Sequence, residues 1–212
     1  METDVGFIIR TRLLTETSQI VHWLSEEHGI LSTVAKGALR PKSAFRGKLD
    51  LFFKCGIGFQ LSRRSQLHPL REVAVENTHA ALRSDLGALR QLSYAVQLIE
   101  QAAEPQTPVP EVFHLFADLV DAETSAGSSP ALALRFELRL LVGLGLAPDL
   151  AQAALDAKGR QIVRTWIDAP LASALDSPSP RDLRSINQWL HGYLIYHLGK
   201  YPRARTSAIG LA

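Results

Sequence analysis

The spacing of apolar residues changes near residue 76, and this change constrains the fold more than any other feature of the sequence. Within residues 49–61 apolar and other side chains alternate, which places one apolar face on an extended chain: Leu49, Leu51, Phe53, Cys55, Ile57, Phe59 and Leu61. A period of two predicts a half-buried strand, whereas the period of about 3.6 seen after residue 76 predicts amphipathic helices. The sequence therefore predicts a β domain, residues 1–76, followed by an all-α domain, residues 77–212.

The first part contains five segments that have strand-like alternation. Glu27-His28-Gly29 predicts a hairpin turn between the second and the third. A fully extended strand over residues 49–61 would be about 43 Å long, so we expect it to bend at Gly56 and Gly58 on its outward face. Five strands in so short a segment predict an OB-type barrel. The predicted strands are residues 4–14, 18–25, 30–36, 49–61 and 68–76.

The second part carries clear helix-start signals. Capping residues or prolines precede four apolar stripes of helical spacing, and the last stripe ends at Gly199. The predicted starts are Asn77 or Thr78, Pro110, Pro130 and Ser179. Residues 147–178 fit neither period well, and RQIVRTWID within them predicts a short strand.

Composition narrows the class of protein. A chain of 212 residues with 46% hydrophobic residues can bury a large core. The single cysteine, Cys55, excludes an internal disulfide and a cysteine-based zinc site. The acidic start and the lack of a long apolar run predict no signal peptide and no membrane span. We therefore expect a cytoplasmic protein.

Positive charge is concentrated in one segment. Although the net charge is only +2, the stretch from Lys36 to Arg64 holds eight basic residues and a single acid, Asp50. Such a surface attracts polyanions. The segment GALRPKS resembles a phosphate-binding loop, but its spacing is a residue short and Pro41 replaces the glycine that the motif requires, so we do not expect nucleotide hydrolysis.

The basic segment also contains aromatic residues, which suits nucleic-acid binding. Single strands are held by cations along the phosphates and by aromatic rings that stack on bases. Phe45 stands between two cations, and Phe52 lies on the predicted outward face; alternatively, Phe45 tucks under the loop and Phe52 packs on the helical part. The candidate DNA-binding residues are Lys36, Arg40, Lys42, Phe45, Arg46, Lys48, Phe52 and Lys54.

The sequence offers no catalytic constellation. None of the seven histidines is four residues from another. The motifs G-x-S-x-G, C-x-x-C and G-x-G-x-x-G are also missing, since Gly56-Ile57-Gly58 lies inside a predicted strand. We therefore predict a protein that is not an enzyme and needs no metal or cofactor. Two other function classes stay open: a protein-interaction adaptor whose basic segment binds an acidic protein segment, and, less favoured for lack of catalytic groups, an RNA-processing or tRNA-binding enzyme.

Three stretches resemble the RecO family of bacterial recombination mediators. EHGILSTVAKGALRPKSAFRGKLDLF matches the family's E-H-G segment and the basic residues after it. LALRFELRLLVGLGLAPDL matches its R-x-F-E-L motif, and YLIYHLGKYPRARTS matches a helix ending in H-L-G before a basic tail. The three stretches occur in the family's order and span most of the chain.

The resemblance implies an OB barrel, a helical domain and a DNA-repair function. It implies binding of single- and double-stranded DNA, annealing of complementary strands and, with the partner RecR, help for RecA in displacing single-stranded DNA-binding protein at the nucleoid. It also implies that the five cations from Lys36 to Lys48 contact DNA. Arg135, with Arg139, becomes a candidate contact for the acidic C-terminal tail of single-stranded DNA-binding protein.

One departure from the family pattern concerns zinc. Many members carry a four-cysteine zinc site after the segment that matches GLGLAPDL, but residues 151–167 contain no cysteine. We therefore expect no zinc in the degenerate region, residues 147–178.

Overall fold

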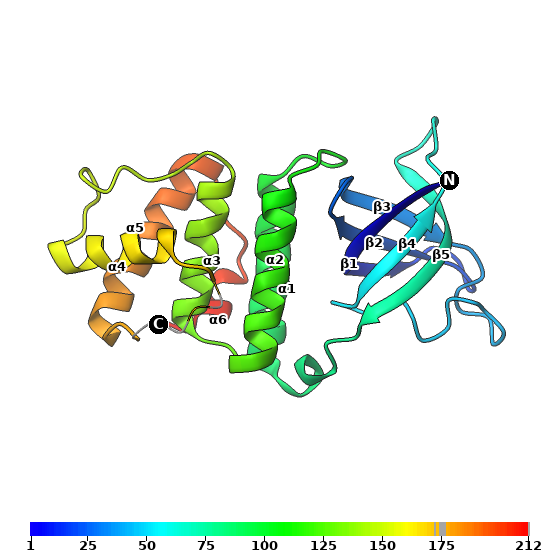
Figure 1. The fold of residues 1–212 in the computed structure, drawn as a ribbon, viewed down its shortest axis with the longest axis horizontal. Helices are drawn as coiled ribbons and strands as arrows, with labels where there is room; N and C mark the ends of the chain where they lie inside the picture. The colour runs from blue at the N-terminus through cyan, green and yellow to red at the C-terminus, as the bar shows by residue number, and fades with distance from the viewer. Residues whose placement is uncertain (172, 174–176, 212) are drawn as a thin grey trace. The chain divides into compact units, whose positions relative to one another are not determined.

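Five strands precede the helices in the computed structural model, which describes residues 1–171, 173 and 177–211 (Figure 1). This order confirms the predicted β-then-α fold. Residues 172 and 174–176, part of the degenerate zinc-site region, lie outside the described residues. The elements are β1 (Glu2–Leu13), β2 (Gln19–Ser25), β3 (Gly29–Ala35), β4 (Lys54–Phe59), β5 (Leu67–Asn77), the 3-10 helix η1 (Ala80–Ser84), α1 (Leu86–Ala102), α2 (Pro110–Ala126), α3 (Pro130–Gly143), α4 (Ala157–Asp168), α5 (Pro180–Leu198) and α6 (Arg205–Ile209).

The strands close into a barrel in the order β1-β2-β3-β5-β4. All neighbours pair antiparallel except β3 and β5, which pair in parallel over a few residues. The β2–β3 hairpin turns at the predicted Glu27-His28-Gly29. The prediction of a five-stranded OB-type barrel is confirmed.

The predicted strand over residues 49–61 is wrong in its first third. Residues 50–53 form a turn closed by a bond from the Phe53 amide to the Asp50 carbonyl, 3.3 Å, and Phe52 has a positive φ of 62°. β4 starts only at Lys54. Apolar alternation continued through the turn, so periodicity could not reveal it. Of the two glycines at which we expected a bend, Gly58 adjoins a register shift in the pairing of β4 with β5; a second shift lies between Lys54 and Cys55.

The barrel core is built from the inward faces of the strands. Cys55, Ile57 and Phe59 of β4 are buried among apolar residues of the other four strands, as their alternation predicted. Trp23 is fully buried, and its indole nitrogen donates to the Thr33 hydroxyl at 2.8 Å. This bond satisfies the one polar atom of the largest core side chain.

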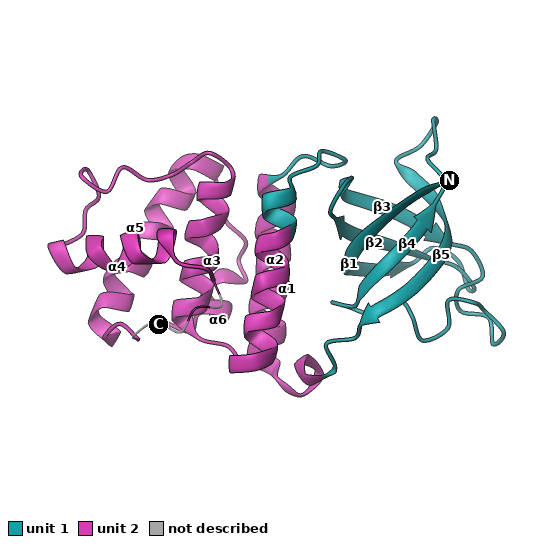
Figure 2. Ribbon diagram, viewed as in Figure 1, with its two compact units in different colours: residues 1–80, 103–113 teal, residues 81–102, 114–212 magenta. Residues whose placement is uncertain are grey.

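The chain forms two compact units, shown in Figure 2. The barrel unit contains residues 1–80 and 103–113, and the helical unit contains residues 81–102 and 114–212. In the barrel unit, residues 103–113 lie against the start of β3: Ile30 forms a β-bridge with Pro105. A Cβ at Gly29 would lie only 2.2 Å from the Thr107 carbonyl oxygen, so this turn position requires glycine.

Three of the four predicted helix starts are confirmed, at Pro110, Pro130 and Ser179. The start at Asn77 or Thr78 is wrong: β5 continues to Asn77, and α1 begins only at Leu86, where the Asp85 carboxylate accepts from the Ala88 amide. Pro130 is in the first turn of α3, and Ser129 caps it. Ser179 and Asp182 form a capping box at the start of α5, which ends at Gly199 in a left-handed conformation. The predicted strand RQIVRTWID is instead part of α4, in which Val163 and Trp166 are buried. Among the described residues, no helix is both long and apolar enough to cross a membrane.

A buried ion pair joins α3 to α6. The guanidinium of Arg205 binds both carboxylate oxygens of Glu137 at 2.8 Å, and both side chains are at most 5% exposed. Tyr94 of α1 donates its hydroxyl to the same carboxylate. Burial alone would lower the pKa of Arg205, but the Glu137 carboxylate holds it above its ordinary value. The two motifs that contain these residues, R-F-E-L and the basic tail, thus meet in one structural contact.

A second buried carboxylate of the helical unit has no such partner. Glu123, in the last part of α2, is 2% exposed, and neither of its oxygens accepts a hydrogen bond from the described residues. Burial and, second, the negative charge of Asp85 raise the pKa of Glu123 to about 7. Glu123 therefore holds a proton in the folded protein under conditions where an exposed glutamate would not.

Candidate nucleic-acid interface

The connection between β3 and β4, residues 36–53, is termed the basic loop. Most of it is a chain of overlapping turns, each closed by a bond from an amide to the carbonyl three residues earlier. Gly37 and Gly47 have positive φ values of 67° and 74°, which glycine adopts without strain. The bonds run from Ala38 to Ala35, Arg40 to Gly37, Ser43 to Arg40, Arg46 to Ser43, and Lys48 to Phe45.

The basic loop is anchored to the barrel at several points. Ala38 is buried in the barrel core, and Phe45 and Leu49 pack against that core from its edge. The Gly37 amide donates to the Ser18 hydroxyl at 3.1 Å, and the Leu39 amide donates to the Thr17 carbonyl at 3.0 Å. These contacts hold the basic loop on the β1–β2 hairpin.

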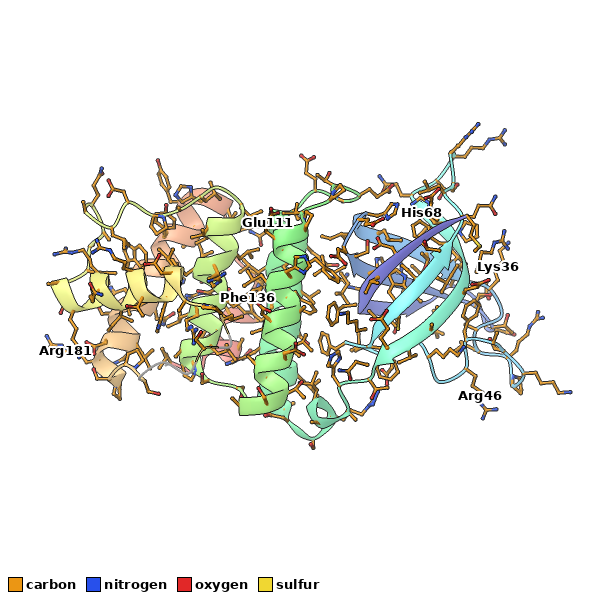
Figure 3. The ribbon with its side chains drawn as sticks, in the orientation of Figure 1. Lys36, Arg46, His68, Glu111, Phe136 and Arg181 are labelled. Carbon is orange, nitrogen blue, oxygen red and sulfur yellow. The ribbon has the colours of Figure 1, made fainter. Side chains whose placement is uncertain are left out.

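Four of the predicted cations are exposed. Lys36, Arg40, Lys42 and Arg46 lie on the surface of the basic loop, and Figure 3 shows Lys36 and Arg46 projecting away from the barrel. Arg46 donates to the Pro41 carbonyl at 3.1 Å, which uses one of its five N–H groups. Because no Asp or Glu lies between Lys36 and Leu49, the positive charge of this segment is not neutralised within it.

The other two predicted cations are half-buried at the barrel surface. The Lys48 ammonium donates to the Val73 carbonyl at 3.2 Å. The Lys54 ammonium lies 3.9 Å from the Glu76 carboxylate across the β4–β5 pair. Both can still donate toward a ligand, because an ammonium has three N–H groups.

The two predicted aromatic contacts have different environments. Phe45 is half-buried, with part of its ring packed against the core and part accessible. Phe52, expected on an outward face, is only 3% exposed in the turn before β4. Its backbone is held on both sides: its amide donates to Ile8, and its carbonyl accepts from His79, each at 2.8 Å. A buried ring has no free face for a base, so the predicted outward position of Phe52 is wrong.

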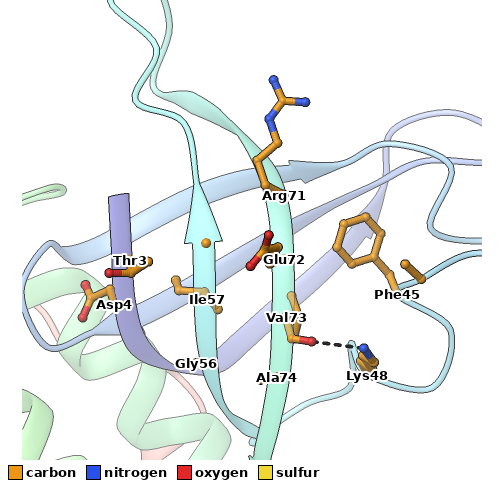
Figure 4. Close-up of a pocket in the computed structure, with 12 residues that line it drawn as sticks. Thr3, Asp4, Phe45, Lys48, Gly56, Ile57, Arg71, Glu72, Val73 and Ala74 are labelled. Carbon is orange, nitrogen blue, oxygen red and sulfur yellow. Dashed lines mark hydrogen bonds between the residues drawn. The ribbon is translucent and has the colours of Figure 1, made fainter. Parts of the chain in front are cut away.

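Two surface grooves meet at Phe45, which is the one residue that lines both. One is the loop groove, about 360 Å³, between the basic loop and the start of β2; it contains Arg40 and Arg46. The other is the glycine groove, about 480 Å³, on the outer face of β1, β4 and β5 (Figure 4). Its lining includes Thr3, Phe45, Lys48, Gly56, Gly58, Arg71 and Glu72. The sequence did not reveal the glycine groove, because strand register decides which residues are neighbours there.

Arg135 and Arg139, the predicted partner-binding residues, are bonded to backbone in the helical unit. Arg135 is 7% exposed and donates to the carbonyls of Pro170 and Ser173 at 2.7 and 3.1 Å. Arg139 donates to Ile167 and Ala169 at 3.2 and 2.6 Å. The two guanidinium groups therefore hold the segment at the end of α4 and after it. A tail-binding role would need guanidinium groups that are free at the surface, and these are bonded to the protein.

One group in the described part of the chain has the composition of a metal site. Asp4, Glu27 and His28 place one ligand atom each within 4.8 Å of the others. However, the Asp4 carboxylate accepts from the amides of Val5 and Glu27 and contacts His28 Nδ1 at 2.8 Å. These bonds account for the burial of Asp4 and hold the β2–β3 turn. Cys55 is buried, which raises the pKa of its thiol to about 12 and leaves it protonated.

Family models match both parts of the chain. Residues 1–79 match the model described as "Recombination protein O N terminal", and residues 83–161 match "Recombination protein O C terminal". Together these segments contain every predicted site residue in both units.

Similar proteins carry the same family name. A "DNA repair protein RecO" of Pasteurella multocida is 35% identical over 70% of this chain and 61% of its own length. Another, of Exiguobacterium sibiricum, is 29% identical over 68% of this chain, which spans only 57% of that relative. A third, of Xanthomonas campestris pv. campestris, is 28% identical over 93% of this chain and 91% of its own length. Together with the barrel and the two matched segments, these similarities show that the chain belongs to the RecO family.

Proposed function

We propose that this protein is a non-enzymatic recombination mediator in DNA repair, which binds single- and double-stranded DNA and anneals complementary strands. The observation that carries the proposal is the basic loop: four exposed cations on a loop of fixed turns, with no acid among them, beside a half-exposed phenylalanine. The names of the relatives and the OB-type barrel support the same class of function.

The proposed binding mode uses phosphates more than bases. Lysine and arginine on an exposed loop release counterions when they bind phosphates, and this contribution is independent of sequence. Neutralisation of the phosphates also removes the repulsion between two complementary strands, which favours annealing. Lys36, Arg40, Lys42, Arg46 and Lys48 would provide the contacts, with Lys54 at the edge and Phe45 as the stacking ring.

The proposed partners follow from family membership. RecR would bind this protein, and the pair would help RecA to replace single-stranded DNA-binding protein, whose acidic C-terminal tail would contact the helical unit. Arg135 and Arg139 could reach that tail only if they exchange backbone carbonyls for its carboxylates. DNA as ligand implies work in the cytoplasm, at the nucleoid.

A salt titration of the triple variant Arg40→Gln/Lys42→Gln/Arg46→Gln tests the proposal. For about five neutralised phosphates on a single strand, log affinity should fall with log salt at a slope of roughly −3.5. The triple variant should bind DNA more weakly, with a slope reduced by about 2, and should anneal complementary strands more slowly.

The control is the triple variant Arg181→Gln/Arg184→Gln/Arg203→Gln, which removes three exposed arginines of the helical unit. Both variants should unfold within about 0.5 kcal/mol of the unmodified protein, because their substitutions are on the surface. If the loop variant binds DNA as the unmodified protein does, the basic loop is not the DNA site, and an acidic protein segment becomes the better ligand for it.

A further inference from the structure

The glycine groove shares Phe45 and Lys48 with the basic loop, but its strand residues have no role in the loop-and-phosphate binding mode. Phe45 forms the boundary between it and the loop groove, where Arg40 and Arg46 lie. Because the ring is packed against the barrel core on one side, its position is fixed before any ligand binds. A flexible chain held by the cations of the loop groove would cross this ring to reach the glycine groove.

The floor of the glycine groove is the outward face of β4. Gly56 and Gly58 point outward there, and the residues paired with Gly58 on the adjacent strands are Thr3 of β1 and Glu72 of β5. Gly56 is half-buried and exposes flat strand backbone, against which a planar ring can lie, whereas Gly58 is buried beside the Glu72 side chain. Since β4 is paired on both sides in a closed barrel, a peptide cannot add to it as a further strand.

The charges of the glycine groove match a nucleotide. Figure 4 shows Phe45 and Lys48 on one side of the groove and Thr3 on the other. Lys48 donates one N–H to the Val73 carbonyl, and its other two can bind a phosphate. The exposed carboxylate of Glu72 can accept hydrogen bonds from the N–H groups of a base. It would repel an acidic peptide, whose charges would enter the groove, whereas a nucleotide keeps its charge at the rim beside Lys48.

We propose that the glycine groove is a nucleobase-binding site, in which a base of single-stranded DNA lies on Gly56 and contacts Phe45, with its phosphate at Lys48. This inference rests on the proposed DNA binding by the basic loop. It adds a base-dependent contribution to affinity, and it places that contribution on β1, β4 and β5 and not on the β2–β3 face that OB folds commonly use.

A blocking substitution tests the site. A Cβ at Gly56 would make only ordinary contacts, 3.6 Å from the Glu76 carboxylate, so Gly56→Val fits the strand and fills the groove. The probes are a twelve-nucleotide thymidine strand and an abasic strand of equal length, titrated by fluorescence anisotropy. The unmodified protein should bind the thymidine strand more tightly than the abasic strand, by roughly 5- to 150-fold for one stacked base.

Gly56→Val should lose most of this preference and keep its salt slope, while Thr11→Val, a substitution of β1 outside both grooves, should change neither. Phe45→Leu, which keeps apolar packing and removes the ring, should also lower the preference. If Gly56→Val and Phe45→Leu both keep the unmodified preference, the nucleobase site is wrong, even where the triple loop variant still weakens binding. If that variant binds normally, the proposed function itself fails.

Discussion

The barrel unit and the helical unit use charged side chains in opposite ways. In the basic loop four of the five cations are exposed and make few bonds to the protein. In the helical unit Arg135, Glu137 and Arg205 are buried, and each is bonded to other groups of the same unit. The arginines of the basic loop are therefore available to ligands, whereas Arg135 and Arg205 hold the helical unit together.

This difference shows why residue type alone does not identify a binding site. A guanidinium group that is nine-tenths buried has already exchanged water for carbonyl or carboxylate oxygens, and a ligand must compete with those bonds. An exposed one has lost little hydration and can bind a phosphate at low cost. Substitutions should therefore affect stability in the helical unit and DNA affinity in the basic loop.

The largest expected effect is on the buried ion pair. Arg205→Ala leaves the Glu137 carboxylate buried without its bidentate partner, which should lower the free energy of unfolding by about 3 to 5 kcal/mol. Urea denaturation followed by far-ultraviolet circular dichroism measures this loss, because the helices dominate that signal. Arg203→Ala, an exposed arginine two residues away, should change stability by less than about 0.5 kcal/mol.

An apolar replacement of the whole cluster distinguishes two causes of this loss, the unpaired carboxylate and the lost packing. The triple variant Tyr94→Phe/Glu137→Leu/Arg205→Met removes every polar member of the buried group, so no charge is left uncompensated. It should recover most of the stability that Arg205→Ala loses. A triple variant as unstable as Arg205→Ala would show that packing, and not the unpaired carboxylate, causes the loss.

The next effect is a pH dependence from Glu123. Its pKa is about 7 in the folded protein and near 4.5 when exposed, so the folded state binds the proton more tightly. The stabilisation from this proton is complete below about pH 4.5, and it is lost as the pH rises to about 7. Glu123→Gln, which cannot ionise, should therefore be more stable than the unmodified protein by about 3 kcal/mol near pH 8 and equal to it near pH 4.

Denaturation series at both pH values measure this difference. Glu111→Gln, which changes an exposed glutamate of the same helix, is the matched control and should show no pH-dependent gain. If the difference between Glu123→Gln and the unmodified protein is the same near pH 4 and near pH 8, the carboxyl group does not carry a raised pKa.

The smallest expected effect is on the segment after α4. Arg139→Ala removes two hydrogen bonds from a charged donor to the carbonyls of Ile167 and Ala169, and it should lower stability by about 1 to 3 kcal/mol. Hydrogen exchange should show faster opening of the last turn of α4. Arg181→Ala is the exposed control and should leave both measurements unchanged. A normal exchange rate in Arg139→Ala would mean that Arg135 alone is sufficient to hold this segment.

Much of the fold was predictable because its signals are local. The change of period, the capping box at Ser179 and the prolines at the helix starts act within a few residues. One error arose where a distant contact overrides the local pattern. The alternation predicts that Phe52 faces outward, but the turn at residues 50–53 and the bond from His79 place it inside. The error at RQIVRTWID has another cause: its β-branched residues favour a strand, but a local signal, the Asp156 cap, starts a helix just before it.

The candidate site was only half predictable for the same reason. The basic loop is contiguous, so its cations could be recognised together. The glycine groove brings Thr3, Gly58 and Glu72 side by side through strand register, which one sequence does not specify. Likewise, Arg135 and Arg139 bind backbone carbonyls at the end of α4 and after it, and one sequence does not show that these carbonyls lie within their reach.

The Glu137–Arg205 pair also has a consequence for the order in which the chain folds during synthesis. All five strands of the barrel lie within the first 77 residues, so the barrel can form soon after they leave the ribosome. The partner of Glu137, Arg205, is 68 residues later in the chain, and synthesis of that length takes roughly 3 to 14 s at common translation rates. During that interval the barrel could be folded with its basic loop exposed, while the helical unit still lacks the contact that completes its interior.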